Sequence, residues 1–107
     1  MQSDSPTGKC FRYVEPKELN GYGWVRAYKI VKPDTVASLY EVYSVNLYVN
    51  YDNTSEVRSA SIVCGSEVLD ASEIVRMERM EQDEYDNMRC KALQWITRKH
   101  QEMINVK

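Results

Sequence analysis

Residues 24–64 read WVRAYKIVKPDTVASLYEVYSVNLYVNYDNTSEVRSASIVC, and this stretch decides the fold. It holds three segments of alternating apolar and polar side chains, separated by two short turn sequences at 32–35 and 52–55. Alternation with a period of two is typical of strands that bury one face. In the first turn, Pro33 presets the backbone angle that a reversal needs. The stretch therefore predicts an antiparallel meander.

The two turns also predict which residues lie opposite one another. The two sets of expected neighbours place Tyr43 on the same sheet face, which supports a single register. The segment 36–51 would span about 50 Å if it were straight, so we expect a bulge or bend near Ser44. The expected pairs are Trp24–Tyr43, Arg26–Glu41, Tyr28–Leu39 and Ile30–Ala37 in the first hairpin, and Val49–Arg58, Leu47–Ala60, Val45–Ile62 and Tyr43–Cys64 in the second.

The last third of the chain is predicted to be helical, over residues 70–104. Asp70 and Glu73 have the spacing of a helix N-cap with a reciprocal glutamate. Apolar residues then recur at steps of three and four. The charged run 81–84 interrupts this stripe, and Asp83 could cap a second helix. One long helix and a broken helix are both compatible with the pattern, and we favour a break near Asp83.

Length and composition indicate one α+β domain: a sheet of three or four strands over 11–64, followed by a helix packed on one face. The domain is expected over 10–107, after a flexible tail at 1–9 that has no apolar side chains. With 14 basic and 16 acidic residues the net charge is −2, which disfavours a nucleic-acid binder.

The three cysteines form no Cys-x-x-Cys motif, which favours a reducing, cytoplasmic location. No apolar run approaches the roughly 20 residues that span a bilayer, so no membrane association is expected.

Catalytic chemistry finds little support in the sequence. His100 is the single histidine, and Cys90 lies about 15 Å from it along the same predicted helix. No motif for a nucleophile, a phosphate loop or a metal site is present, and no motif resembles that of a known family. We therefore expect no catalytic residues, no metal and no cofactor.

The more informative feature is a second apolar sheet face. One layer of helix cannot cover both faces of a sheet. Either residues 11–22 fold across the second face, or it binds a partner, since tyrosine is enriched at protein interfaces. Stacking of RNA or single-stranded bases on this tyrosine-bearing face is a further alternative. The residues predicted to bind a partner are Val25, Tyr40, Val42, Tyr48 and Val63.

A pocket on the helix-facing side is a different hypothesis. There, Arg26 and Glu41 would form a cross-strand pair between the rings of Trp24 and Tyr43. A surface ion pair is the simpler interpretation. A partly buried pair could bind a small polar ligand, as a binding protein or an enzyme would.

Charge along the helical region suggests self-association. Acidic residues dominate 67–86 and basic residues dominate 87–107. Antiparallel docking of two copies would match acidic with basic ends, although simple complementation of the helix dipole gives the same pattern. The leading hypothesis is a non-enzymatic, homodimeric protein-interaction module that acts as a small regulator or inhibitor of a larger protein, of a type found in phages and mobile elements.

Overall fold

The computed structural model describes residues 5–105 and confirms the α+β class. Its antiparallel sheet has five strands in the order β4-β3-β2-β1-β5, instead of the expected three or four. The additional strands are short: one precedes the meander and one lies inside the region predicted to be helical. The elements are β1 (Cys10–Val14), β2 (Tyr22–Pro33), β3 (Leu39–Asn50), β4 (Asn53–Asp70), α1 (Ala71–Ile74), β5 (Glu78–Met80) and α2 (Gln82–Ile104).

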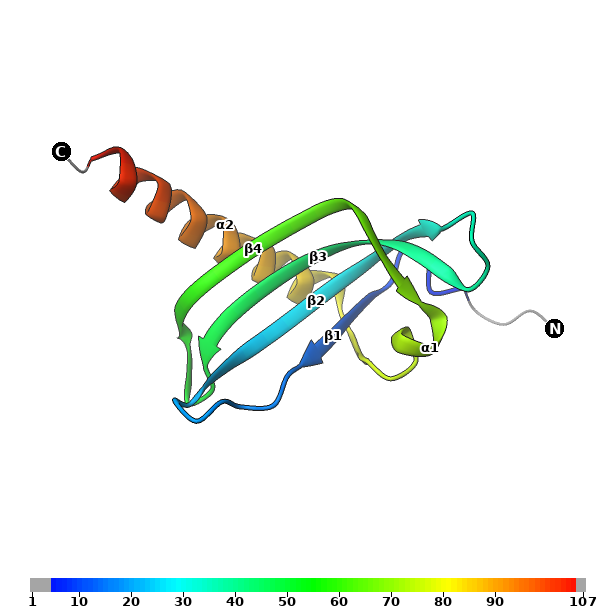
Figure 1. Ribbon diagram of the computed structural model, residues 1–107, viewed down its shortest axis with the longest axis horizontal. Helices are drawn as coiled ribbons and strands as arrows, with labels where there is room; N and C mark the ends of the chain where they lie inside the picture. Colours follow the sequence, from blue (N-terminus) through cyan, green and yellow to red (C-terminus); the bar gives the residue numbers. More distant parts are fainter. Residues whose placement is uncertain (1–4, 106–107) are drawn as a thin grey trace.

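The sheet has helix α2 on one face, as predicted, and only the short α1 on the other (Figure 1). The main core lies between the sheet and α2. Burial of these apolar side chains is the main favourable term in the folding of such a layer. The fully enclosed members of this core are Cys10, Ala27, Val45, Leu47, Val49, Met80, Tyr85 and Ala92.

The register of the second hairpin is confirmed over most of its length. Leu47 lies opposite Ala60, Val45 opposite Ile62 and Tyr43 opposite Cys64. Nearer the turn the prediction is wrong, because a bulge places Val49 opposite Val57 instead of Arg58. The strands thus keep the predicted alignment where the core is built.

The register predicted for the first hairpin is wrong. Trp24 lies opposite Tyr48, and Arg26 lies opposite Asn46 instead of Glu41. The reversal occurs at 34–38, where Ser38 has a positive φ of 68°, so β2 continues through Pro33. The slip is an odd number of residues, which moves every side chain of β2 to the other face. Trp24 and Arg26 therefore point away from α2.

The bend predicted near Ser44 is present. Tyr43 pairs with Cys64, but Val42 pairs with Glu67, so Gly65 and Ser66 are extra residues in β4. Both have positive φ, 91° and 65°, which glycine adopts at little cost. Beyond this bulge β4 carries the chain to α1, on the face opposite α2.

The predicted N-cap at Asp70 is confirmed. Its side chain accepts a hydrogen bond from the Ser72 backbone N–H, at 2.9 Å, and the Glu73 carboxylate accepts one from the Asp70 backbone N–H, at 2.8 Å. The predicted break near Asp83 is also present, because α2 begins at Gln82. Residues 75–80 were expected to be helical, and this prediction is wrong. They form a turn and β5, which pairs with β1 and buries Met80 beside Cys10.

Two further features concern the ends and the surface. Gly8 donates to the Ile30 carbonyl at 2.8 Å and Ile30 donates to the Lys9 carbonyl at 3.0 Å, so this part of the expected tail is held against β2. Residues 1–4 of that tail lie outside the described residues. No helix within 5–105 is long and apolar enough to cross a membrane.

Candidate functional site

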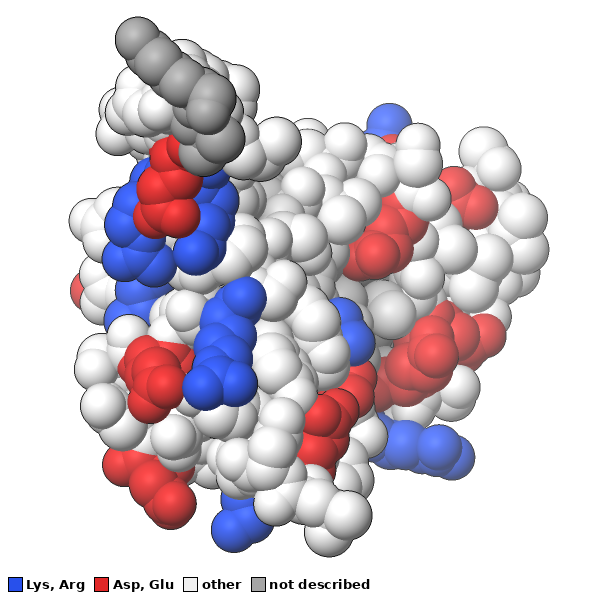
Figure 2. Space-filling view, turned by 60° about the vertical axis from the view of Figure 1, so that its left-hand side comes forward, with Lys and Arg blue, Asp and Glu red and all other residues white. Residues whose placement is uncertain are grey.

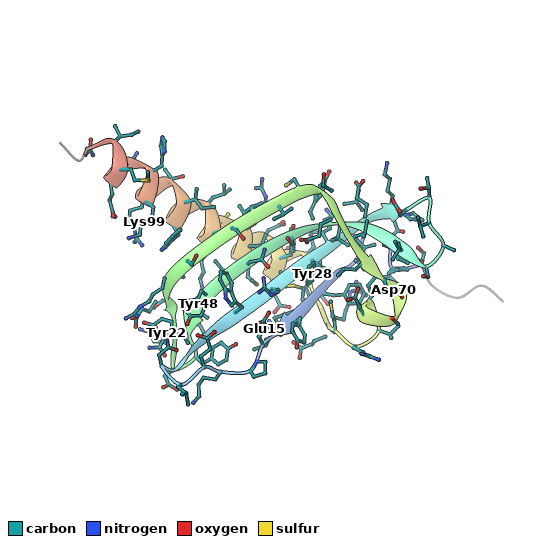
Figure 3. The ribbon with its side chains drawn as sticks, viewed as in Figure 1. Glu15, Tyr22, Tyr28, Tyr48, Asp70 and Lys99 are labelled. Carbon is teal, nitrogen blue, oxygen red and sulfur yellow. The ribbon has the colours of Figure 1, made fainter. Side chains whose placement is uncertain are left out.

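The sheet face turned away from α2 is called the open face below. Figure 3 shows Tyr22 and Tyr48 at one end of it and Tyr28 nearer to α1. It consists of alternate residues of three long strands, because side chains of one strand point to the two faces in turn. Its central members are Tyr22, Trp24, Arg26, Tyr28, Ser44, Asn46, Tyr48, Ser59, Ser61 and Val63.

An aromatic row occupies the end of the open face farthest from α1. The Tyr48 ring lies 5.5 Å from the Tyr22 ring, in a stacked arrangement, and 5.3 Å from the Trp24 ring. Guanidinium groups cover two of these rings: Arg58 lies 4.3 Å from the centre of Tyr22, and Arg26 lies 5.0 Å from that of Trp24. Such contacts fix the orientation of the rings.

Arg26 is the hub of a hydrogen-bond network beside this row. Its Nε donates to Glu15 Oε2 at 2.6 Å, and its Nη1 donates to Asn46 Oδ1 at 2.8 Å. The Asn46 amide in turn donates to the hydroxyls of Ser44 and Ser61, both at 3.3 Å. Ser44 is fully buried and Asn46 is 6% exposed. The buried polar groups therefore satisfy one another and hold the face rigid.

The segment 15–21 borders the open face without covering it. The Tyr48 hydroxyl donates to the Glu18 carboxylate and accepts a 3.1 Å hydrogen bond from the Asn20 amide. The Tyr22 hydroxyl donates to Glu56, and this hydrogen bond raises the pKa of Tyr22. Residues 16–20 are themselves exposed. The alternative that 11–22 fold across the second face is therefore wrong, because β1 extends the sheet sideways.

A hollow of about 370 Å³ separates the open face from α1. Arg26 and Glu15 line one side, and Glu73 and Arg76 line the other. Burial raises the pKa of Tyr28, which also lines the hollow; the carboxylates of Glu67, Glu15 and Glu73 raise it further, and Arg26 opposes them. Acidic and basic side chains therefore line both sides of the hollow.

The residues predicted to bind a partner are divided between several environments. Tyr48 and Val63 lie on the open face. Tyr40 lies on the same side, half-buried beside the cluster of Ile30, Val42 and Ile74. Val42 also lies on this side, but it packs against Ile74 of α1 and is fully buried, so it is not accessible to a partner. The placement of Val25 was wrong: it faces α2, opposite Leu47, because of the register slip.

The four residues of the predicted pocket are not brought together. Trp24 and Arg26 lie on the open face, Glu41 lies opposite Lys32, and Tyr43 points to the side of α2. The carboxylate that pairs with Arg26 is Glu15, which sequence reasoning missed. Glu15 directly follows β1, so recognising β1 as a neighbour of β2 could have found it.

Neither a metal centre nor a known relative points to another site among the described residues. Among residues 5–105, no group of three or more histidine, cysteine, aspartate or glutamate side chains could hold a metal ion. Comparisons with protein-family models, with curated proteins and with solved structures found no match to this chain. The geometry of the open face is therefore the basis for assigning a function.

Proposed function

We propose that this chain is a non-enzymatic protein-interaction module that binds a protein partner on the open face. The observation that carries the proposal is the pair of half-buried rings of Trp24 and Tyr48, backed by Tyr22, which is only 4% exposed, and fixed beside the Arg26 network on a face that α2 does not cover. Tyrosine, tryptophan and arginine dominate the binding energy of protein interfaces. Rings and polar groups that are already ordered lose little conformational entropy on binding.

The charged side chains around the open face are of both signs. Four arginines lie on this side, Arg26, Arg58, Arg76 and Arg79, and Glu15 already neutralises Arg26. The carboxylates on this side are Glu15, Glu18, Glu56, Glu67 and Glu73. Complementary charge speeds encounter and selects partners, so this face fits a partner surface that also carries both signs of charge.

The two alternatives receive less support from the same face. The mixed charge of this face does not form the basic groove that normally attracts the phosphates of RNA or single-stranded DNA. In the hollow beside α1, Arg26 is paired with Glu15, and Glu73 accepts a hydrogen bond from the Asp70 backbone. A small polar ligand would have to displace these internal partners. A regulator or inhibitor that docks on a larger protein needs neither kind of site.

Two tyrosine variants can test the proposal. Tyr48→Ala removes the centre of the aromatic row, and Tyr43→Ala removes a tyrosine that is 36% exposed on the other face. We expect a tagged chain to capture a protein partner from native lysate, and Tyr43→Ala to retain it. Tyr48→Ala should lower its affinity at least tenfold, a typical effect for a central aromatic residue. Affinity for the purified partner is then measured by titration calorimetry.

The controls separate loss of binding from loss of fold. Circular dichroism should show that both variants keep the wild-type spectrum. Binding should weaken as salt is added, because complementary surface charges are screened. A Tyr48→Ala chain that keeps every partner, or a wild-type chain that captures nothing, would contradict the proposal.

A further inference from the structure

The outer edge of β4 is the longest free edge of the sheet. β4 spans 18 residues and has only β3 beside it, whereas the opposite edge strand, β5, has three residues. Natural sheets protect their edges with lysine, proline or very short strands. The six residues 59–64, Ser-Ala-Ser-Ile-Val-Cys, contain none of these and carry no charge. This part of β4 therefore presents unpaired backbone groups with no protecting side chain.

A groove runs along this same edge. Ile62, from the α2 side of the sheet, and Ser61, from the open face, both line it, so the groove reaches around the edge of the strand. The other wall is formed by residues of α2: Trp95, Ile96, Lys99, His100 and Met103. The volume of the groove is about 470 Å³. The groove thus joins the free backbone edge to a helix surface that is apolar with a basic rim.

The end of α2 extends beyond the sheet (Figure 1). Met103 is 76% exposed and Ile104 is 65% exposed at this end. Figure 2 shows basic side chains gathered below the grey terminal residues, with an acidic one among them. Glu102 lies 3.8 Å from Arg98 and 3.4 Å from Lys99, so one carboxylate offsets part of the charge of two cations and the helix end stays basic. An apolar surface therefore projects past the edge beside a small net positive charge.

We propose that a second copy of this chain pairs with β4, edge to edge, and forms a two-fold dimer. A two-fold axis perpendicular to the sheet makes two copies of one edge strand antiparallel, which is the pairing already used throughout this sheet. The projecting end of each α2 then lies over the groove of the other copy, where Met103 and Ile104 cover Ile62 and Trp95. Each copy supplies both the groove and the apolar side chains that fill it.

The size of this surface is that of a small interface. The uncharged segment and its two flanking residues extend for about 27 Å along the strand. A helix layer on a sheet is about 20 Å thick. The resulting area of about 540 Å² lies below the ~800 Å² per partner that standard interfaces bury, so we expect a dimer of about micromolar affinity.

This inference is independent of the partner-binding function of the open face. A two-fold axis perpendicular to the sheet leaves both open faces on the same side of one continuous sheet. The dimer would present two binding faces to a partner, and avidity would then raise the apparent affinity for a repeated target. Either proposal can fail without the other.

The test is the mass in solution of the wild type and two glutamate variants. Light scattering at about 100 µM, where micromolar dimers persist, should give twice the 12.5 kDa of one chain. Met103→Glu should weaken the dimer at least about tenfold, because it replaces the apolar side chain that fills the groove with a carboxylate that must lose its water on binding. Leu19→Glu alters a fully exposed leucine away from β4 and should remain dimeric. Both positions are exposed in the single chain, so neither variant should unfold it.

Hydrogen exchange provides a second, local measurement. Amides of residues 59–64 should exchange more slowly in concentrated than in dilute wild-type protein, and Met103→Glu should remove this difference. A monomeric wild type would overturn the proposal. So would a dimer that Met103→Glu leaves intact, or β4 amides that gain protection only when an unrelated protein is added.

Discussion

At the scale of single residues, Arg26 has the most connections on the open face. Its guanidinium group joins Glu15 from the end of β1, Asn46 from β3 and the ring of Trp24 from β2 itself. Because Asn46 is buried, its carbonyl oxygen depends on this one donor group. An arginine fits this position because its planar guanidinium group can donate hydrogen bonds in two directions while it stacks on an aromatic ring.

Arg26→Ala should therefore destabilise the fold. We expect a loss of about 1–3 kcal/mol in the free energy of unfolding, the usual cost of a buried polar group left without a partner. Urea denaturation followed by circular dichroism measures it. Arg58→Ala is the matched control, because Arg58 is 61% exposed and exposed substitutions usually change stability by less than about 0.5 kcal/mol. Equal effects of the two substitutions would contradict the structural role given to Arg26.

Tyr85 provides a pH test of the core beneath α2. Burial raises the pKa of its hydroxyl to about 12, against 10 for a free tyrosine. The unfolded chain then loses this proton more easily than the folded one. Stability from Tyr85 is complete below pH 10 and is lost as the pH rises toward 12. Tyr85→Phe should lessen the fall in urea midpoint across this range, and an unchanged fall would show that other groups cause it.

At the scale of elements, the chain shows which turns can be predicted from sequence. The second hairpin turns at Tyr51 and Asp52 instead of over the expected loop 52–55. Irregularities on either side of Val49 then restore the predicted register at Tyr43, Val45 and Leu47, where the core is built. The register of the first hairpin was predicted wrongly because Pro33 was assigned to the turn, whereas it is the last residue of β2. The reversal depends on Ser38 at positive φ, a conformation for which serine gives no sequence signal.

The short elements were only partly predicted: the N-cap at Asp70 gave the start of α1, but neither the end of α1 nor β5 was expected. α1 has four residues and β5 has three, too few to show a hydrophobic period. Their positions are fixed by tertiary contacts: Ile74 of α1 covers Val42, and Met80 of β5 packs near Cys10. The sequence therefore predicted a tyrosine-bearing face that the long helix does not cover, but several of the residues assigned to this face were wrong.

The contribution of the N-cap to the stability of α1 can be tested by lowering the pH. The hydrogen bond from the Ser72 backbone N–H lowers the pKa of Asp70 below its usual value. The stabilisation is present above the unfolded pKa and is lost as the pH falls through the folded pKa. Acid should therefore loosen α1, as seen in the methyl NMR signals of Ile74 and Val42. Asp70→Asn keeps a capping oxygen without the titrating group, so its signals should not move over the same pH range.

At the scale of the whole molecule, one asymmetric layer of helix explains both proposals. α2 crosses the sheet from β1 and passes beyond β4, covering one face and leaving a projecting end. The face it leaves open bears the aromatic row, and the edge it passes bears the uncharged part of β4. Each surface contains one of the two tryptophans, Trp24 on the open face and Trp95 in the groove.

The most direct test of the partner-binding face measures the acrylamide quenching of these two tryptophans separately. In Trp95→Phe the emission comes from Trp24, and in Trp24→Phe it comes from Trp95. Adding the purified partner should shield Trp24 and leave the quenching of Trp95 unchanged. Shielding of Trp95 alone, or of neither tryptophan while the partner is bound, would contradict the assignment of binding to the open face.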